Sequence, residues 1–251
     1  MPAFAAGFQC HCTTGGNNPP VDYDRITPVS EKTVLILASN SPRRQQLLAL
    51  GGWMFHVQPA EVDESLKPGE AAGDYVLRLA KAKARACAQS AHSDQVIVAA
   101  DTTVVLGDEV LGKPADLAEA ARMLARLRGR THQVYTGLAV LRMADKRLRT
   151  DLCITDVPMR DYSDEEINAY VATGDPLDKA GAYAIQHPKF QPVAEMKGCF
   201  ASVMGLPLCH LVRTMRRFDL APGQDAAVRC QAFLDYTCPV NRRILRGEKI
   251  G

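Results

Sequence analysis

The sequence predicts an α/β fold with a mixed, partly antiparallel central sheet that is flanked by helices. Short apolar runs typical of buried strands alternate with segments of helical apolar spacing along most of the 251 residues. Near the middle, two long strand-like segments at residues 133–143 and 148–159 flank a turn at residues 144–146. Such a pair indicates an antiparallel ribbon, so the sheet is expected to contain both strand directions.

The first half of the chain supplies the first strands and helices. The apolar run at residues 33–38 predicts a strand, and Pro42 fits the first position of a helix with Ser41 as its N-cap. Gly51 and Gly52 end that helix. The next expected elements are a short strand at 53–58, a helix at 70–91, a strand at 95–100 that ends at Asp101, and an extended segment at 103–106 before a hairpin turn at Gly107.

In the second half, helices are marked by their ends. Asp116 with Glu119 forms a capping box before a helix that stops at Gly129, and Ser163 with Glu166 forms another before a helix that closes at Gly174. A charged, glycine-containing loop at 175–186 precedes a last helix that opens at 205–207 and runs through about Phe218. The expected organisation is a flexible N-terminal extension at 1–31, a catalytic domain at 32–218, and a C-terminal extension at 219–251 whose basic end is solvated.

Composition narrows the functions that are possible. The formal net charge of +2 argues against a general nucleic-acid binder, and no apolar run approaches the roughly 20 residues of a membrane helix. The first seven residues lack the features of a secretory signal, and the eight cysteines are scattered, so we expect a reducing, cytoplasmic setting. Cys10-His11-Cys12 could be half of a metal site, but its spacing is too tight for the usual zinc pairs.

The segment Ser39-Asn40-Ser41-Pro42-Arg43-Arg44 is the first candidate for binding. It follows a predicted strand and opens a helix, whose N-terminus carries partial positive charge and free N–H groups. Arginines normally favour the other end of a helix, so Arg43 and Arg44 in the first turn indicate a negatively charged guest. A polyphosphate is the guest we expect.

Charged residues also follow the other predicted strands. Glu64 lies in the loop after the second strand, Asp101 follows the third, and Lys113 is held between Gly112 and Pro114. Because α/β proteins bind ligands at strand ends, these carboxylates and cations predict a divalent ion beside phosphate. Taken singly, Asp101 could instead cap a turn and Lys83 could be a solvated helix residue. The other charged residues at such points are Asp63, Asp178 and Lys179.

The chain has no Walker A pattern, no G-x-G-x-x-G turn after a strand and no G-x-S-x-G elbow. Its motifs, in order and spacing, instead resemble the Maf family of nucleoside triphosphate pyrophosphatases. The matching segments are LILASNSPRRQQLLALGG at 35–52, VDE at 62–64, YVLRLAKAKA at 75–84, ADTTVVLGDEVLGKP at 100–114, ML..L.G.TH.V.TG at 123–137, DKAGAYAIQ at 178–186 and VMGLPL at 203–208.

The resemblance implies a sheet split into two lobes with a cleft, as in the related inosine triphosphate pyrophosphatases. It implies hydrolysis of a nucleoside triphosphate by water to a monophosphate and pyrophosphate, a nucleotide diphosphatase reaction that removes unwanted or modified nucleotides. Asp101 matches the proton acceptor and shares Mg²⁺ or Mn²⁺ with Glu64. The residues that would neutralise or bind the phosphates are Lys83, Lys113, Arg44, Ser39 and Ser41.

The resemblance also implies a nucleotide preference. Arg43, Thr102 and Gln186 match the branch that acts on dTTP and UTP, whereas the branch that acts on 7-methyl-GTP tends to carry tryptophan after the proline. His187-Pro188 and Gly198-Cys199-Phe200 depart from the pyrimidine branch and leave open a 7-methyl-GTP or purine-directed pyrophosphatase. An alternative of another class is a nucleotide-binding regulator of cell division or septum formation. The family further implies a homodimer, and from the composition we expect no membrane or nucleic-acid partner.

Overall fold

A computed structural model describes residues 33–251, and the predictions for residues 1–31, Cys10-His11-Cys12 among them, lie outside this range. Its centre is a six-stranded sheet in the order β2-β1-β3-β5-β6, with β4 paired to β3. The strands are β1 (Leu35–Leu37), β2 (Phe55–Val57), β3 (Val96–Leu106), β4 (Glu109–Leu111), β5 (Thr131–Arg142) and β6 (Arg147–Pro158).

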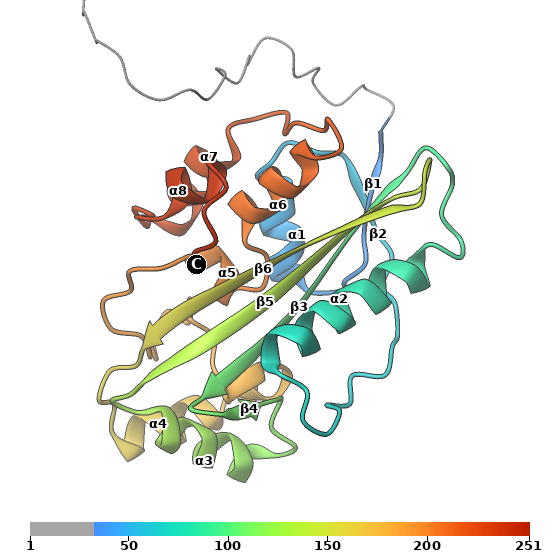
Figure 1. Ribbon diagram of the computed structural model, residues 1–251. Helices are drawn as coiled ribbons and strands as arrows, with labels where there is room; N and C mark the ends of the chain where they lie inside the picture. Colours follow the sequence, from blue (N-terminus) through green and yellow to red (C-terminus); the bar gives the residue numbers. More distant parts are fainter. Residues whose placement is uncertain (1–32) are drawn as a thin grey trace, which may run out of the picture.

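Helices flank this sheet on both faces. Figure 1 shows α2 along one side of the long strands and α1, α6, α7 and α8 across the strands from it, with α3 and α4 beside β4. The helices are α1 (Pro42–Ala49), α2 (Ala72–Cys87), α3 (Leu117–Leu127), α4 (Asp164–Val171), α5 (Phe200–Val203), α6 (Leu208–Arg216), α7 (Ala226–Leu234) and α8 (Asn241–Leu245), with 3₁₀ turns η2 (Asp175–Asp178) and η3 (Ala180–Ala182). Within residues 33–251, none of these helices combines the length and apolarity needed to cross a bilayer.

The predicted fold class is confirmed by the strand directions. β1 pairs in parallel with both β2 and β3, whereas β3, β5 and β6 pair antiparallel. The expected ribbon is the β5–β6 pair, and the expected hairpin turn at Gly107 joins β3 to β4.

Alternate residues of the strands serve two separate cores, as the period of a strand requires. Ile36, Ile97 and Ala99 face α2 and pack against its Ala80 and Ala84. The other face carries the larger core, which is covered by α1, α3, α4 and the C-terminal helices. Consecutive residues of β3 therefore point to opposite sides of the sheet.

β3 does not end at Asp101 as expected, because β5 pairs with it continuously from Val96 to Val105. The strand that ends there is β1, whose last partner in β3 is Val98. β4 joins β3 only from Val104 onward. Asp101 thus lies within β3, where β5 pairs with one side of the strand. On the other side, β1 has already ended and β4 has not yet begun.

The prediction that the helix after residue 205 is the last one was wrong. α7 and α8 follow α6, and Ala226, Val240 and Ile244 of this segment are buried in the large core. Both helices are short and bury few side chains, so their apolar periodicity is too weak to identify them from sequence.

Two of the three expected helix caps differ from their predicted form. Ser163 and Glu166 form the complete capping box. Asp116 accepts a hydrogen bond from the Glu119 amide, but the Glu119 carboxylate accepts from the Ala115 amide and not from the Asp116 amide. Ser41 occupies the N-cap of α1 without a side-chain bond to the helix; it is the Ser39 hydroxyl that accepts from the Ser41 amide, at 3.2 Å.

Candidate functional site

Lys83 joins two carboxylates at the centre of the candidate site. Its Nζ lies 2.6 Å from Asp101 Oδ1 and 2.6 Å from Glu64 Oε1. Lys83 and Asp101 are only 8% and 7% exposed, whereas the Glu64 side chain is 48% exposed. The solvated-helix alternative for Lys83 is therefore wrong, and the buried Asp101 carboxylate has the partner that burial of a charge requires.

The packing of α2 on the sheet brings Lys83 to Asp101. Asp101 shares the α2 side of β3 with Ile97 and Ala99, and it pairs with Gly137 of β5. A Cβ at Gly137 would lie 2.7 Å from the carbonyl of Val76 in α2, so only glycine permits this close approach of helix and strand. The approach lets Lys83, two turns further along α2, contact Asp101 directly.

The loop that carries Glu64 is fastened to α2 by two side chains. The Tyr75 hydroxyl donates to Glu64 O at 2.8 Å, and Arg78 Nη2 donates to Ser65 O at 2.9 Å. Arg78 in turn forms an ion pair with Glu70 at 2.6 Å. An exposed loop thereby holds its carboxylate against a buried lysine.

The two carboxylates differ in acidity although they share one ammonium group. Burial raises the pKa of Asp101 above its ordinary value, against the positive charges of Lys83 and Arg44. Burial also acts to raise the pKa of Glu64, but the hydrogen bond and charge of Lys83, together with Lys113 and Arg44, outweigh it and lower that pKa. Neighbouring acids whose pKa values are pushed apart are a common feature of acid–base sites.

Arg44 is held in place by three hydrogen bonds. Its Nε donates to Gly205 O at 2.9 Å, its Nη1 to Ser39 Oγ at 3.2 Å and its Nη2 to Thr102 Oγ1 at 3.3 Å. Gly205 has a φ of 104°, and a Cβ there would lie 3.1 Å from Arg44 Nε. This position therefore requires glycine for its backbone conformation and leaves little room beside the guanidinium.

A chain of hydrogen-bonded hydroxyl groups extends from the Arg44 guanidinium into the sheet. Thr102 Oγ1 lies 2.9 Å from Thr136 Oγ1, which donates to Ser202 O at 2.9 Å. Thr102 and Thr136 are paired across β3 and β5, so the register of the sheet places the two hydroxyls side by side. This chain links Arg44 to α5.

The carboxylates and the arginine lie on opposite sides of β3, because Asp101 and Thr102 are consecutive. They nevertheless affect each other: burial and Arg43 lower the pKa of Arg44, while the charges of Asp101 and Glu64 raise it. The end of β1 explains this proximity, since beyond Leu37 no strand separates the two sides. The segment from Ser39 to Arg44 follows β1 directly and brings the Arg44 cation close to both acids.

The remaining predicted residues lie around this cluster in different ways. Lys113 is exposed, and its charge contributes to the lowered pKa of Glu64, which places it near the cluster. Arg43 is half-buried, and its charge acts on Arg44 and on Tyr170. Ser41 is half-buried and Gln186 is exposed.

Three charged residues expected at the phosphate site have other roles in the structure. Lys179 donates to the carboxylates of Asp175 and Asp178 at 3.0 and 2.5 Å, which fixes the turn η2. Asp63 accepts from the Ser65 amide at 2.9 Å and shapes its own loop. Charge at a strand end was not sufficient to predict that these residues would join Lys83 and Asp101.

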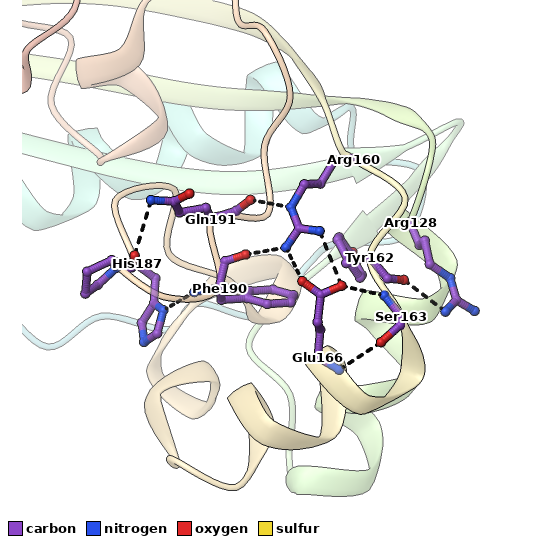
Figure 2. Close-up of polar contacts among 9 residues, drawn as sticks. Arg128, Arg160, Tyr162, Ser163, Glu166, His187, Phe190 and Gln191 are labelled. Atoms are coloured by element: carbon purple, nitrogen blue, oxygen red, sulfur yellow. Dashed lines mark hydrogen bonds and ion pairs between the residues drawn. The ribbon is translucent and has the colours of Figure 1, made fainter.

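Gln186 begins a loop that is fixed at its far end by Arg160. Figure 2 shows Arg160 paired with Glu166 and donating to the carbonyls of Phe190 and Gln191. Within the loop, the Phe190 amide donates to His187 Nδ1 at 2.9 Å. The unexpected His187-Pro188 sequence thus forms an ordered turn next to the predicted specificity residue.

The donor set of Asp101 and Glu64 fits a small divalent cation. Each carboxylate uses one oxygen on Lys83, which leaves the second oxygens for a ligand. Among residues 33–251, no group of three or more His, Cys, Asp or Glu side chains forms a metal cluster. Two carboxylates with substrate phosphates are a usual set for Mg²⁺, which retains several of its waters.

Thr136, Gly205 and Tyr75 were missed as contributors to the site. All three lie within motifs already recognised in the sequence, but the roles of Thr136 and Gly205 depend on sheet register and on a carbonyl that faces Arg44. Tyr75 acts through its hydroxyl on a loop 11 residues earlier. None of these contacts has a signal in local spacing.

Comparison with known proteins gives a consistent set of relatives. The family described as Maf-like protein matches residues 34–218. The dTTP/UTP pyrophosphatase of Anaeromyxobacter dehalogenans is 48% identical over 185 residues, which cover 73% of this chain and 93% of that protein. The dTTP/UTP pyrophosphatases of Hahella chejuensis and Myxococcus xanthus are 44% and 48% identical, and each match covers 76% of this chain and 95% of the relative.

Solved structures give a weaker match. The structure of a HAM1 protein from Coxiella burnetii aligns with 51% of this chain and 73% of that chain, at 17% identity and a TM-score of 0.34. Such a superposition is too poor to support a conclusion about this protein.

Proposed function

The chain belongs to the Maf family, and on this premise we propose that it hydrolyses nucleoside triphosphates to a nucleoside monophosphate and pyrophosphate, with dTTP and UTP as preferred substrates. The observation that carries this proposal is the contact of Lys83 with both Asp101 and Glu64, beside Arg44. Cations and carboxylates in one cluster suit a substrate that is both anionic and attacked by water.

In the proposed reaction, water attacks the α-phosphorus of the nucleotide. A bond forms between the water oxygen and the α-phosphorus, and the bond to the oxygen that bridges the α- and β-phosphates breaks. Asp101 accepts the proton of the water, a role that its raised pKa favours because a stronger base takes the proton more readily. Pyrophosphate leaves with the electron pair of the broken bond.

The cations of the site are assigned to the phosphates. Arg44 is preorganised by its bonds to Gly205, Ser39 and Thr102, so little entropy is lost when it binds the triphosphate. Lys113 is exposed and free to approach the leaving pyrophosphate. Lys83 holds Asp101 and Glu64 in position, and Ser39 and Ser41 lie at the start of α1, where phosphate oxygens are stabilised.

We assign Mg²⁺ or Mn²⁺ to the free oxygens of Asp101 and Glu64. Such an ion lowers the pKa of bound water and neutralises phosphate charge. The ordered position of both carboxylates on Lys83 supports this assignment.

The nucleotide preference is assigned to Arg43, Thr102 and Gln186. Three relatives that are 44% to 48% identical carry the name dTTP/UTP pyrophosphatase, which supports the pyrimidine preference over 7-methyl-GTP and over purine nucleotides. An amide such as Gln186 can donate to and accept from the edge of a pyrimidine. The ordered turn at His187 supplies a further polar side chain beside it.

The experiment that tests the function is a panel of nucleoside triphosphates with detection of pyrophosphate. We expect dTTP and UTP to be hydrolysed fastest, with equal amounts of monophosphate and pyrophosphate formed. Release of single phosphate groups would refute cleavage between the α- and β-phosphates. Binding of nucleotides without turnover would favour the regulator of cell division instead.

We also propose a homodimer in a cytoplasmic setting. All six cysteines within residues 33–251 are free thiols, which supports a reducing compartment. Light scattering on the purified protein tests the dimer, and fractionation of cells tests the compartment.

A further inference from the structure

The segment after residue 218, beyond the part that matches the family, contacts the backbone that holds Arg44. The Tyr236 hydroxyl lies 2.9 Å from Gly198 O and 3.2 Å from Met196 O, so one O–H group is shared between two carbonyls. The Tyr236 ring also packs against Phe200, with 5.6 Å between ring centroids. Tyr236 therefore contacts both the chain that enters α5 and the first residue of α5.

The backbone that Tyr236 holds has little freedom to move. A Cβ at Gly198 would lie 2.6 Å from Thr155 Cγ2 of β6 and 3.1 Å from Gly251 O at the end of the chain. The Cα of Gly198 is thus enclosed by the sheet and by the end of the chain, so the backbone at this position has little room to shift.

The turn that carries Tyr236 is itself well ordered. The Tyr236 amide donates to Gln231 O at 3.2 Å, and the Gln231 side chain accepts from the Cys238 amide at 2.9 Å. At its start, the C-terminal segment is tied to the region after α1 by the Trp53 indole, which donates to Ala221 O at 3.2 Å. The Tyr236 hydroxyl is therefore held in position by a hydrogen-bonded turn.

α5 and the turn after it connect Tyr236 to Arg44 of the candidate site. The Gly205 amide donates to Ser202 O at 2.9 Å, so the turn after α5 moves with the helix. Ser202 O accepts from Thr136, and Gly205 O accepts from Arg44 Nε, both at 2.9 Å. Two of the groups that orient the Arg44 network are thus carbonyls of a four-residue helix and its turn.

We propose that Tyr236 is a positioning residue, which holds α5 so that Gly205 O orients the Arg44 guanidinium for the triphosphate. The inference rests on the proposed function, because it needs a phosphate ligand for Arg44. It assigns to the C-terminal segment a part in substrate binding. Arg44 binds phosphate and does not take the proton of the water. If α5 is held less firmly, binding of the triphosphate should therefore weaken more than the chemical step slows.

Tyr236→Phe tests this directly, because it keeps the ring on Phe200 and removes only the hydroxyl. We expect the KM for dTTP to rise about fivefold while kcat stays within about twofold, as for a coupling of moderate size. Tyr162→Phe is the matched control: it removes a hydroxyl that donates to Leu124 O at 2.8 Å, between the segment after β6 and α3. The control should leave KM unchanged.

Hydrogen exchange gives a readout that does not depend on activity. The amides of Ser202, Met204 and Gly205 are bonded within α5 and its turn, and they should exchange faster in Tyr236→Phe than in Tyr162→Phe. If Tyr236→Phe is too unstable to purify, Gln231→Met loosens the same turn and should raise KM in the same direction.

The outcomes separate this inference from the proposed function. An active wild-type protein whose KM is unaltered by Tyr236→Phe, or whose kcat alone falls, would overturn the positioning role. A wild-type protein that releases no pyrophosphate from any nucleotide would refute the proposed function itself. Unchanged exchange at Ser202 and Gly205 would show that Tyr236 does not hold α5.

Discussion

Lys83 Nζ lies 2.6 Å from Asp101 Oδ1, and both side chains are almost fully buried. This pair joins α2 to β3 at the place where β1 has ended. Because burial raises the pKa of Asp101 while Lys83 opposes that rise, the lysine adjusts how strong a base the carboxylate is. The first two predictions depend on this relationship.

Asp101→Asn should lower kcat by about a hundredfold or more, since a positioned general base contributes on that order. The amide has nearly the same shape and leaves Arg44 and Lys113 in place, so affinity for the nucleotide without divalent metal should change little. Pyrophosphate release measures kcat, and calorimetric titration with dTTP measures affinity. Asp63→Asn is the control, because Asp63 is an exposed carboxylate of the same region that bonds only within its loop. A near-normal rate in Asp101→Asn would remove Asp101 from the mechanism.

The pH dependence of kcat/KM should report the raised pKa of Asp101. A base must be ionised to act, so activity should fall as the pH drops through a value above the ordinary aspartate range. In Lys83→Met the loss of a positive charge raises this pKa further, so the acid limb should move to higher pH. A limb that stays in place, or moves to lower pH, would contradict the assignment of Asp101 as the base.

Removal of divalent metal should abolish turnover. Dialysis against EDTA should leave the fold intact, as judged by circular dichroism, because Lys83 pairs with both Asp101 and Glu64 and balances their charge without the ion. Added Mg²⁺ or Mn²⁺ should restore the rate, and Glu64→Gln should raise the metal concentration needed for half-maximal activity. Full activity in EDTA would refute the metal role of Asp101 and Glu64.

Arg43→Ala should reduce discrimination between nucleotides more than it reduces the rate with the best one. Arg43 lies beside Arg44 and near Tyr170, which packs against His187 at 4.7 Å between ring centroids, next to Gln186. The ratio of kcat/KM for dTTP to that for 7-methyl-GTP measures this discrimination. Gln46→Ala, an exposed change in the same helix, should leave the ratio unaltered. A wild-type preference for 7-methyl-GTP would show that Arg43 had been misinterpreted.

The sequence predicted the parts of this site that depend on strand order and helix ends. Apolar runs identified β1 and β3, and Pro42 identified the start of α1; these elements place Arg44 and Asp101 near one another. What could not be predicted depends on packing. The close approach at Gly137 sets the distance from α2 to β5. Because that distance is short, Lys83 is buried and forms an ion pair with Asp101.

The predictions that failed have a similar cause. Lys179 and Asp178, like Lys113, are charged residues in a loop. The tight turn η2 pairs the Lys179 ammonium with the Asp178 carboxylate, so the lysine is not available to a phosphate. For α7 and α8, burial involves isolated side chains such as Ile244, which no periodic pattern reveals. Long-range contacts, absent from local spacing, decided both cases.

The last prediction concerns the contribution of the C-terminal segment to stability. Ile244 of α8 is 0% exposed, and truncation of a buried isoleucine to alanine removes transfer free energy and leaves a cavity. Ile244→Ala should therefore lower the free energy of unfolding by about 2–5 kcal/mol, measured by urea denaturation. Val228→Ala in α7 is the control, because Val228 is 59% exposed and its truncation should cost less than about 0.5 kcal/mol. Equal, small effects of the two changes would mean that residues 219–251 do not fold as one unit with the sheet. A large effect of Ile244→Ala alone, with the m-value unchanged, would place α8 in the same cooperative transition as Lys83 and Asp101.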